Sequence, residues 1–172
     1  MRFGDFLRAT VLLSAGCATL LGTLTVLGIT REENPRTVIY VTAAWWLAAT
    51  AIGVTLGRRA ETSPPIARLL ASARSETTLP ELRPGTTLIN RLWPLLLSTL
   101  VSAAFAFVEP QVASVAAGFA IIWALAWRRQ ERAVLAIEER DGVRFYVDRT
   151  SPFSPIRLIR TPGFGGTFLR SA

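Results

Sequence analysis

Side chains able to do chemistry are few in this chain and cover a narrow range of types. Among 172 residues there is no histidine and one cysteine, Cys17. The commonest general base of enzymes is therefore absent, and metal sites built from cysteine and histidine are excluded. We predict no catalytic residue, no metal site and no cofactor. The C-terminal third holds four acidic residues with the spacing of a solvated helix face: Glu131, Glu138, Glu139 and Asp141.

Arginine supplies all 19 basic residues, and the formal net charge is +7. A guanidinium group binds phosphate through two parallel hydrogen bonds, so arginines beside a membrane predict contact with anionic head groups or with an acidic partner. The competing interpretation is that they only anchor the ends of membrane-spanning segments. Both interpretations explain the charge without nucleic acid. The candidate lipid or partner contacts are Arg58, Arg59, Arg68, Arg74, Arg128, Arg129 and Arg132.

Two adjacent tryptophans, Trp45 and Trp46, lie near the middle of an apolar segment. A buried indole N–H needs an acceptor, and we expect a hydroxyl group of Thr42, of Thr50 or of a neighbouring helix to supply it. The pair is a candidate for intramembrane packing or for the wall of a groove that holds lipid or a hydrophobic solute. Of the two roles, packing is favoured.

Long apolar segments must position these side chains. They cover residues 9–30, 37–57, 88–108 and 110–127, and the only charged residue in them is Arg91, near the start of the third. Because a spanning helix needs ~20 mostly apolar residues, the sequence predicts an all-α membrane protein with four transmembrane helices. Short connections at Asn34-Pro35 and Glu109-Pro110 predict that the helices form two antiparallel hairpins.

Each predicted span carries small residues four positions apart, a spacing that lets helices approach closely in lipid. An alanine-rich chain also produces this spacing by chance, so the sequence leaves open which of these ridges are interfaces. The ridges are Ser14, Ala18 and Gly22; Ala49, Gly53 and Gly57; Ser98, Ser102 and Ala106; and Ala116, Ala120 and Ala124.

The distribution of arginine predicts the orientation. Segments 1–8, 58–91 and 128–172 hold 17 of the 19 arginines, and the two short connections on the other side hold 2. Since arginine in short loops stays cytoplasmic, we expect a multi-pass protein of the plasma (inner) membrane with both termini in the cytoplasm. The expected division is a transmembrane bundle over residues 1–127, with a cytoplasmic loop at 58–87, and a cytoplasmic tail over residues 128–172.

The two cytoplasmic segments contain short elements of their own. Ser63 and Pro64 predict the start of a short amphipathic helix that carries Ile66 and Leu69 on one face. In the tail, the fourth helix is expected to continue to about residue 140 and to stop at Gly142. Alternating residues over 143–148 then predict a strand, and 156–160 is a second candidate, so the tail is expected to be small and two-stranded.

The sequence therefore leaves three functions open. The first is an accessory or scaffold subunit that acts by association, without enzyme activity, and whose partners are membrane lipids and a second membrane protein or another copy of this chain. The second is an oligomeric small transporter or channel for a hydrophobic solute, since no acidic residue inside a span supports proton coupling. A lipid-modifying membrane enzyme using the four acidic residues ranks last.

Overall fold

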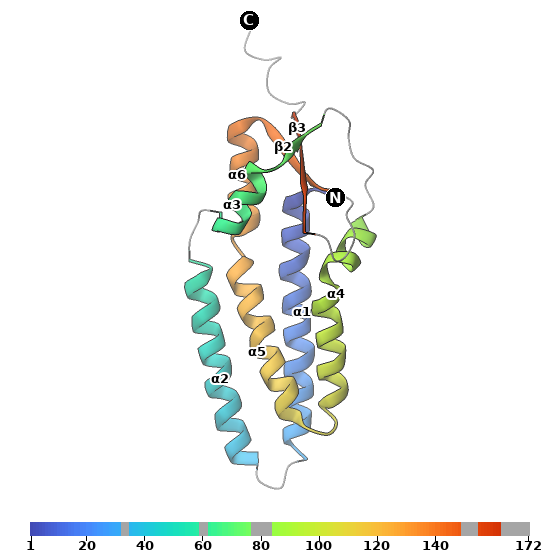
Figure 1. Ribbon diagram of the computed structural model, residues 1–172. Coiled ribbons are helices and arrows are strands. Elements are labelled where there is room, and N and C mark those ends of the chain that lie inside the picture. Colours follow the sequence, from blue (N-terminus) through green and yellow to red (C-terminus); the bar gives the residue numbers. More distant parts are fainter. Residues whose placement is uncertain (32–34, 59–61, 77–83, 149–154, 163–172) are drawn as a thin grey trace, which may run out of the picture. The chain divides into compact units, whose positions relative to one another are not determined.

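The computed structural model of the chain describes residues 1–31, 35–58, 62–76, 84–148 and 155–162 (Figure 1). The chain divides into two compact units. The helix unit is formed by Ala9–Arg58 and Leu92–Arg128, and the mixed unit by Met1–Arg8, Arg59–Arg91 and Arg129–Ala172. Three segments that are far apart in the sequence therefore come together in the mixed unit.

Among the described residues, four helical segments are long and apolar enough to cross a membrane. The first three are α1 (Phe3–Ile29), α2 (Pro35–Leu56) and α4 (Pro84–Phe105). The fourth is α5 (Pro110–Trp127), which is followed closely by α6 (Gln130–Asp141). Six of the twelve residues of α6 are charged, so α5 is the apolar, spanning part. The prediction of four helices that are long and apolar enough to span a membrane is confirmed, and these helices suggest a multi-pass membrane protein.

Proline marks the start of α2, α4 and α5, where its missing N–H has no helical partner to lose and its fixed φ suits the first turn. The third span begins at Pro84 and ends at Phe105, whereas the sequence predicted residues 88–108. Pro94 consequently lies inside the helix. It has no N–H to donate to the carbonyl of Asn90, so this turn lacks one helical hydrogen bond.

Within the helix unit, α2 has its most extensive contacts with α5 (Figure 1). The two helices run parallel, because Trp46 bonds to Ser114 near one end of α5 and Gly57 touches Leu125 near the other. A Cβ atom placed on Gly53 would stand 2.8 Å from the Cβ of Leu125, so the missing side chain lets the two backbones approach. This contact joins helices from the two predicted hairpins and does not test the pairing within each hairpin, so the two antiparallel hairpins stay a prediction.

The small-residue ridges of the helix unit differ in how far they are buried. The ridge of the second span is buried at all three positions, which are Ala49 and Gly53 in α2 and Gly57 just after it. On α5, Ala120 is the one buried member of the expected ridge 116–120–124. The buried small residues of α5 instead include Ala113, Ser114, Ala117 and Gly118. The first and third of these form a core cluster with Leu21 of α1 and Ala106, which follows α4.

The mixed unit combines two helices with a sheet. The helices are α3 (Pro64–Ala71) and α6, and the strands are β1 (Arg74–Ser75), β2 (Val143–Val147) and β3 (Leu158–Pro162). The strand order is β1-β3-β2, in which β3 is parallel to β1 and antiparallel to β2. The strand β1 was not predicted, because two residues are too few to show an alternating pattern.

Backbone hydrogen bonds hold the segments of the mixed unit together. The N–H of Ser63, before α3, donates to Oε1 of the buried Gln130 on α6 at 2.9 Å. The N–H of Val147 donates to the carbonyl of Met1 at 3.0 Å, so the beginning of the chain covers one edge of β2. Between α6 and β2, Gly142 has φ 62°, a left-handed conformation that glycine adopts without strain.

Candidate functional site

Trp45 is fixed in the interface between α2 and α5. Its indole N–H donates to the backbone carbonyl of Val115 at 3.2 Å, and its ring meets Phe119 edge-on, with 5.4 Å between the ring centres. Gly118 makes room for the ring, because a Cβ atom there would stand 2.5 Å from Cε2 of the indole. These contacts place Trp45 against α5, and its packing role stays a prediction.

Trp46 has a second role besides packing. Its indole N–H donates to the carbonyl of Ser114 at 3.0 Å, and its ring packs against the core cluster that contains Leu21 and Ala117. The far edge of the same ring faces Gly22 of α1, where a Cβ atom would be 3.5 Å from Cη2. Trp46 also lines a cavity, whereas Trp45 is not among the residues that line it.

The prediction that hydroxyl groups accept the hydrogen bonds of the two indole N–H groups is wrong. Both indoles donate to backbone carbonyls of α5, and Thr42 instead accepts a hydrogen bond from the hydroxyl of Ser114 at 3.1 Å. A helix carbonyl has a second lone pair and can accept a side-chain donor as well as its own helical N–H. Each indole thus links α2 to the α5 backbone, and each indole N–H has a hydrogen-bond acceptor.

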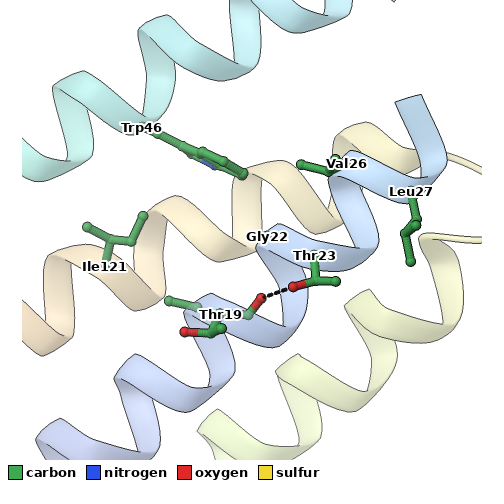
Figure 2. Close-up of a pocket in the computed structure, with 8 residues that line it drawn as sticks. Thr19, Gly22, Thr23, Val26, Leu27, Trp46 and Ile121 are labelled. Carbon is green, nitrogen blue, oxygen red and sulfur yellow. Dashed lines mark hydrogen bonds between the residues drawn. The ribbon is translucent and has the colours of Figure 1, made fainter. Parts of the chain in front are cut away.

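An open groove of about 510 Å³ lies among α1, α2 and α5 (Figure 2). Figure 2 shows the ring of Trp46 reaching from α2 toward Gly22 of α1, with Ile121 of α5 on the same side. The members of the first small-residue ridge, Ala18 and Gly22, form part of its wall. The remaining lining residues, which the sequence did not single out, are Thr19, Thr23, Val26 and Leu27.

The side-chain hydrogen-bond donors of the groove wall already have acceptors. The hydroxyl of Thr19 donates to the carbonyl of Ala15 at 3.0 Å, and the hydroxyl of Thr23 donates to the carbonyl of Thr19 at 2.9 Å. The indole N–H of Trp46 is bonded to Ser114. The lining residues carry no ionisable group. The groove therefore offers an apolar surface, suited to a hydrocarbon ligand and unsuited to an ion.

The candidate arginines fall into both units. Arg58, after α2, and Arg128, after α5, are exposed in the helix unit. Because Gly57 lies against Leu125, these two arginines follow neighbouring ends of a parallel helix pair. Arg59 lies outside the described residues. The remaining candidates are exposed in the mixed unit: Arg68 on α3, Arg74 on β1, Arg129 before α6 and Arg132 on α6.

Ion pairing distinguishes the exposed groups of the mixed unit. Arg74 lies 3.5 Å from Glu76, and Arg140 lies 2.8 Å from Asp141. The Arg140 guanidinium hydrogen-bonds to the carboxylate of Asp141 and holds the pKa of that carboxyl below its ordinary value. Exposed pairs of this kind contribute little to folding, because solvent screens the two charges. They leave the positive charge of the surrounding surface largely intact.

Glu138 differs from the other acidic residues of α6, because its side chain is buried. Burial raises the pKa of its carboxyl above the ordinary value of 4.5, while the N–H of Phe145, which donates to Oε1 at 2.8 Å, and the charges of Arg2 and Arg144 oppose this shift. The carboxyl of Glu138 accepts the N–H of Phe145 in β2, and this hydrogen bond links α6 to the sheet. That position does not suit a general acid for a lipid substrate.

A second, smaller cavity of about 240 Å³ lies in the mixed unit, lined by Met1, Arg2, Asp5, Pro84 and Tyr146. Among the described residues, no group of three or more histidine, cysteine, aspartate or glutamate side chains is placed to hold a metal ion.

Comparisons with protein-family models, with curated proteins and with solved structures find no match.

Proposed function

We propose that this chain is a multi-pass protein of the plasma (inner) membrane that acts by association, as an accessory or scaffold subunit without enzyme activity. The observation that carries the proposal is the composition of the mixed unit. The three segments that fold into it hold 15 of the 19 arginines, although they are separated in the sequence by apolar helices. A single arginine-rich unit is what one membrane face requires when basic residues stay on the cytoplasmic side.

The proposed orientation places the mixed unit and both termini in the cytoplasm. Cys17 is the only cysteine and is buried, so Cys17→Ala gives a background for single-cysteine labelling. In that background, Arg68→Cys reports on the exposed face of α3, and Glu109→Cys reports on the exposed corner before α5. A membrane-impermeant maleimide added to intact cells should label Glu109→Cys and should reach Arg68→Cys only after the cells are opened. The reverse pattern contradicts the orientation.

The arginines of the mixed unit support contact with anionic head groups or with an acidic partner. Arg68 and Arg132 are exposed, and each arginine near an anionic surface contributes ~1 kcal/mol to attraction. Neutralising both, as Arg68→Gln with Arg132→Gln, should weaken retention of phosphatidylglycerol by the purified protein. Arg31→Gln, an exposed change outside the mixed unit, is the matched control and should leave retention unchanged. Equal losses in both variants contradict a specific role for this surface.

The surface of α4 supports association inside the membrane. Its apolar window is 11% buried, the lowest fraction of the four spanning segments, and Leu97, Leu100 and Phe105 are among its exposed side chains. We propose this face as the contact with a second membrane protein or another copy of the chain. Leu97→Cys and Leu100→Cys in the Cys17→Ala background should form cross-links to that partner, whereas Leu47→Cys on α2 should not. Equal cross-linking from both helices contradicts the assignment.

One observation favours the alternative function, an oligomeric transporter or channel for a hydrophobic solute. The groove among α1, α2 and α5 is apolar, and Trp46 forms part of its wall. A protein of this kind should move a fluorescent hydrophobic solute across proteoliposomes, and Trp46→Ala should change the rate. Absence of any protein-dependent movement contradicts transport and leaves association in place.

A further inference from the structure

The groove among α1, α2 and α5 covers half of a membrane. On α1 its wall extends from Ala18 to Leu27, which are nine residue steps apart, or about 14 Å at 1.5 Å per step. The hydrocarbon core of a bilayer is ~30 Å thick, so one leaflet accounts for ~15 Å. Trp46 stands at the middle of α2, and its ring faces Gly22, so it forms one side of the groove. Because the lining residues of α1 belong to the second half of this helix, the groove lies in the leaflet that holds the end of α1 at Ile29.

Water is a poor occupant of this groove. A buried water molecule typically needs two to four polar partners. The hydroxyls of Thr19 and Thr23 and the indole N–H of Trp46 already donate to backbone carbonyls. An empty groove is also unfavourable, because its lining loses dispersion contacts on the open side. The physical requirement is an apolar occupant.

The length of the groove distinguishes between two apolar occupants. A transmembrane helix of a partner is ~10–12 Å wide with its side chains and extends through both leaflets, so it would follow α1 over its whole spanning length. The groove follows α1 over one leaflet only. A single acyl chain has this length, and it enters from the same leaflet. The lipid needs no polar contact in the groove, since its head group stays at the surface.

We propose that this groove is a binding site for one acyl chain of a membrane phospholipid from the leaflet that holds the end of α1 at Ile29. The chain lies along Ala18, Gly22 and Val26 of α1, beside Trp46 of α2 and Ile121 of α5. The bound chain fills the open side of the helix unit. The site depends on α1, α2 and α5 spanning a membrane, and it depends neither on the orientation of the termini nor on the proposed association.

Photolabelling in a bilayer tests this site with the full chain. The protein is reconstituted into phosphatidylcholine vesicles that contain a phosphatidylcholine with a diazirine on one acyl chain, irradiated, and the labelled residues are mapped by tandem mass spectrometry. Label should concentrate at Trp46 and at the groove residues of α1, which are Ala18, Thr19, Gly22, Thr23, Val26 and Leu27. Leu12 and Leu20 are exposed on α1 and are absent from the groove wall, so they provide the internal reference. Equal labelling of the groove and the reference overturns the proposal.

A matched pair of substitutions adds a second readout. Gly22→Leu places a side chain in the groove, whereas Gly16→Leu makes the same change on α1 at an exposed position with no atom within 4 Å of a Cβ. Groove labelling should fall about threefold or more in Gly22→Leu, a factor that corresponds to ~0.6 kcal/mol. Thr23→Leu fills the groove independently and should act in the same direction. Unchanged labelling in both groove variants overturns the site.

A cysteine test excludes the competing occupant. In the Cys17→Ala background, Thr23→Cys places a thiol in the groove wall. If a second copy of the chain or a partner helix fills the groove, an oxidant or a short bifunctional maleimide will form a covalent cross-link between the new thiol at position 23 and that protein. Such a product overturns the lipid site. Reaction confined to a thiol-reactive lipid in the same vesicles supports it.

Discussion

Gly118→Ala tests whether the two tryptophans join α2 to α5 as the structure describes. The added Cβ atom would stand 2.5 Å from Cε2 and 2.8 Å from Cδ1 of Trp45, and nearer still to Nε1. Contacts below 3.0 Å are not tolerated, so the indole must move away from α5. This displacement breaks the 3.2 Å hydrogen bond to Val115 and the edge-on contact with Phe119.

The size of the effect follows from these contacts. Adding a methyl group to a closely packed site costs ~1–3 kcal/mol. A side-chain hydrogen bond inside a membrane protein contributes ~0.6 kcal/mol on average. We therefore expect Gly118→Ala to lower the free energy of unfolding by about 2–3 kcal/mol. Gly16→Ala, at a position where the Cβ meets nothing within 4 Å, should leave it unchanged or raise it by up to ~1 kcal/mol, because alanine is the better helix former.

Unfolding in mixed micelles with an increasing mole fraction of sodium dodecyl sulfate, followed by tryptophan fluorescence, measures both changes. A double-mutant cycle then isolates the contact. If Trp45 is the group displaced, the cost of Gly118→Ala should be much smaller in a Trp45→Ala background. Full additivity of the two changes, or a Gly118→Ala variant as stable as the Gly16→Ala control, would refute the reasoning.

Two further changes test buried polar groups. The hydroxyl of Ser14 is buried and has no hydrogen-bond partner among the described residues, so Ser14→Ala should leave stability unchanged or raise it by ~1 kcal/mol in the same micelle assay. Burial raises the pKa of Glu138, so its contribution to stability is fully present below the ordinary value of 4.5 and is lost as pH rises through the pKa of the folded state. Glu138→Gln should therefore reduce the fall in melting temperature between pH 4 and pH 8, and Glu139→Gln, an exposed neighbour, should not. An equal pH dependence in Glu138→Gln and the wild type contradicts the burial argument.

The helices that cross the membrane could be predicted because one property defines them. A long apolar segment must form a helix in lipid, where every backbone polar group needs an internal partner. Hydropathy carries no information about which helix packs on which, and all four spans have a small-residue ridge. The parallel pairing of α2 with α5 therefore depends on shape details, such as Gly118 opposite Trp45, that the ridge spacing does not encode.

The candidate site was predicted in part for a similar reason. Trp45 and Trp46 stand out by composition, but their acceptors are backbone carbonyls of α5, and every residue carries such a group. The lining of the groove by Thr19, Thr23 and Val26 depends on how three helices meet, and these residue types are common in any span. Glycines in the apolar helices were the available signal for close approach: Gly53 and Gly57 lay in a predicted ridge, whereas Gly118 did not.

The mixed unit shows the limit of local patterns. Alternation over 143–148 marked the region where β2 forms, and Gly142 marked the end of α6. The partner on the far side of β3 is β1, two residues from a loop between two spans, and it carries no pattern of its own. The sheet is therefore built from segments that only the complete fold brings together.

The central claim is that this chain acts by association in a membrane, and the mass of the intact particle tests it most directly. The protein is extracted from its native membrane into nanodiscs without detergent, and the particle is weighed by native mass spectrometry after the lipids are removed in stages. We predict a fixed ratio of this chain to a second membrane protein or to further copies of itself, and loss of that ratio when Leu97 and Leu100 are both changed to alanine. A single chain that carries only lipid would contradict the account.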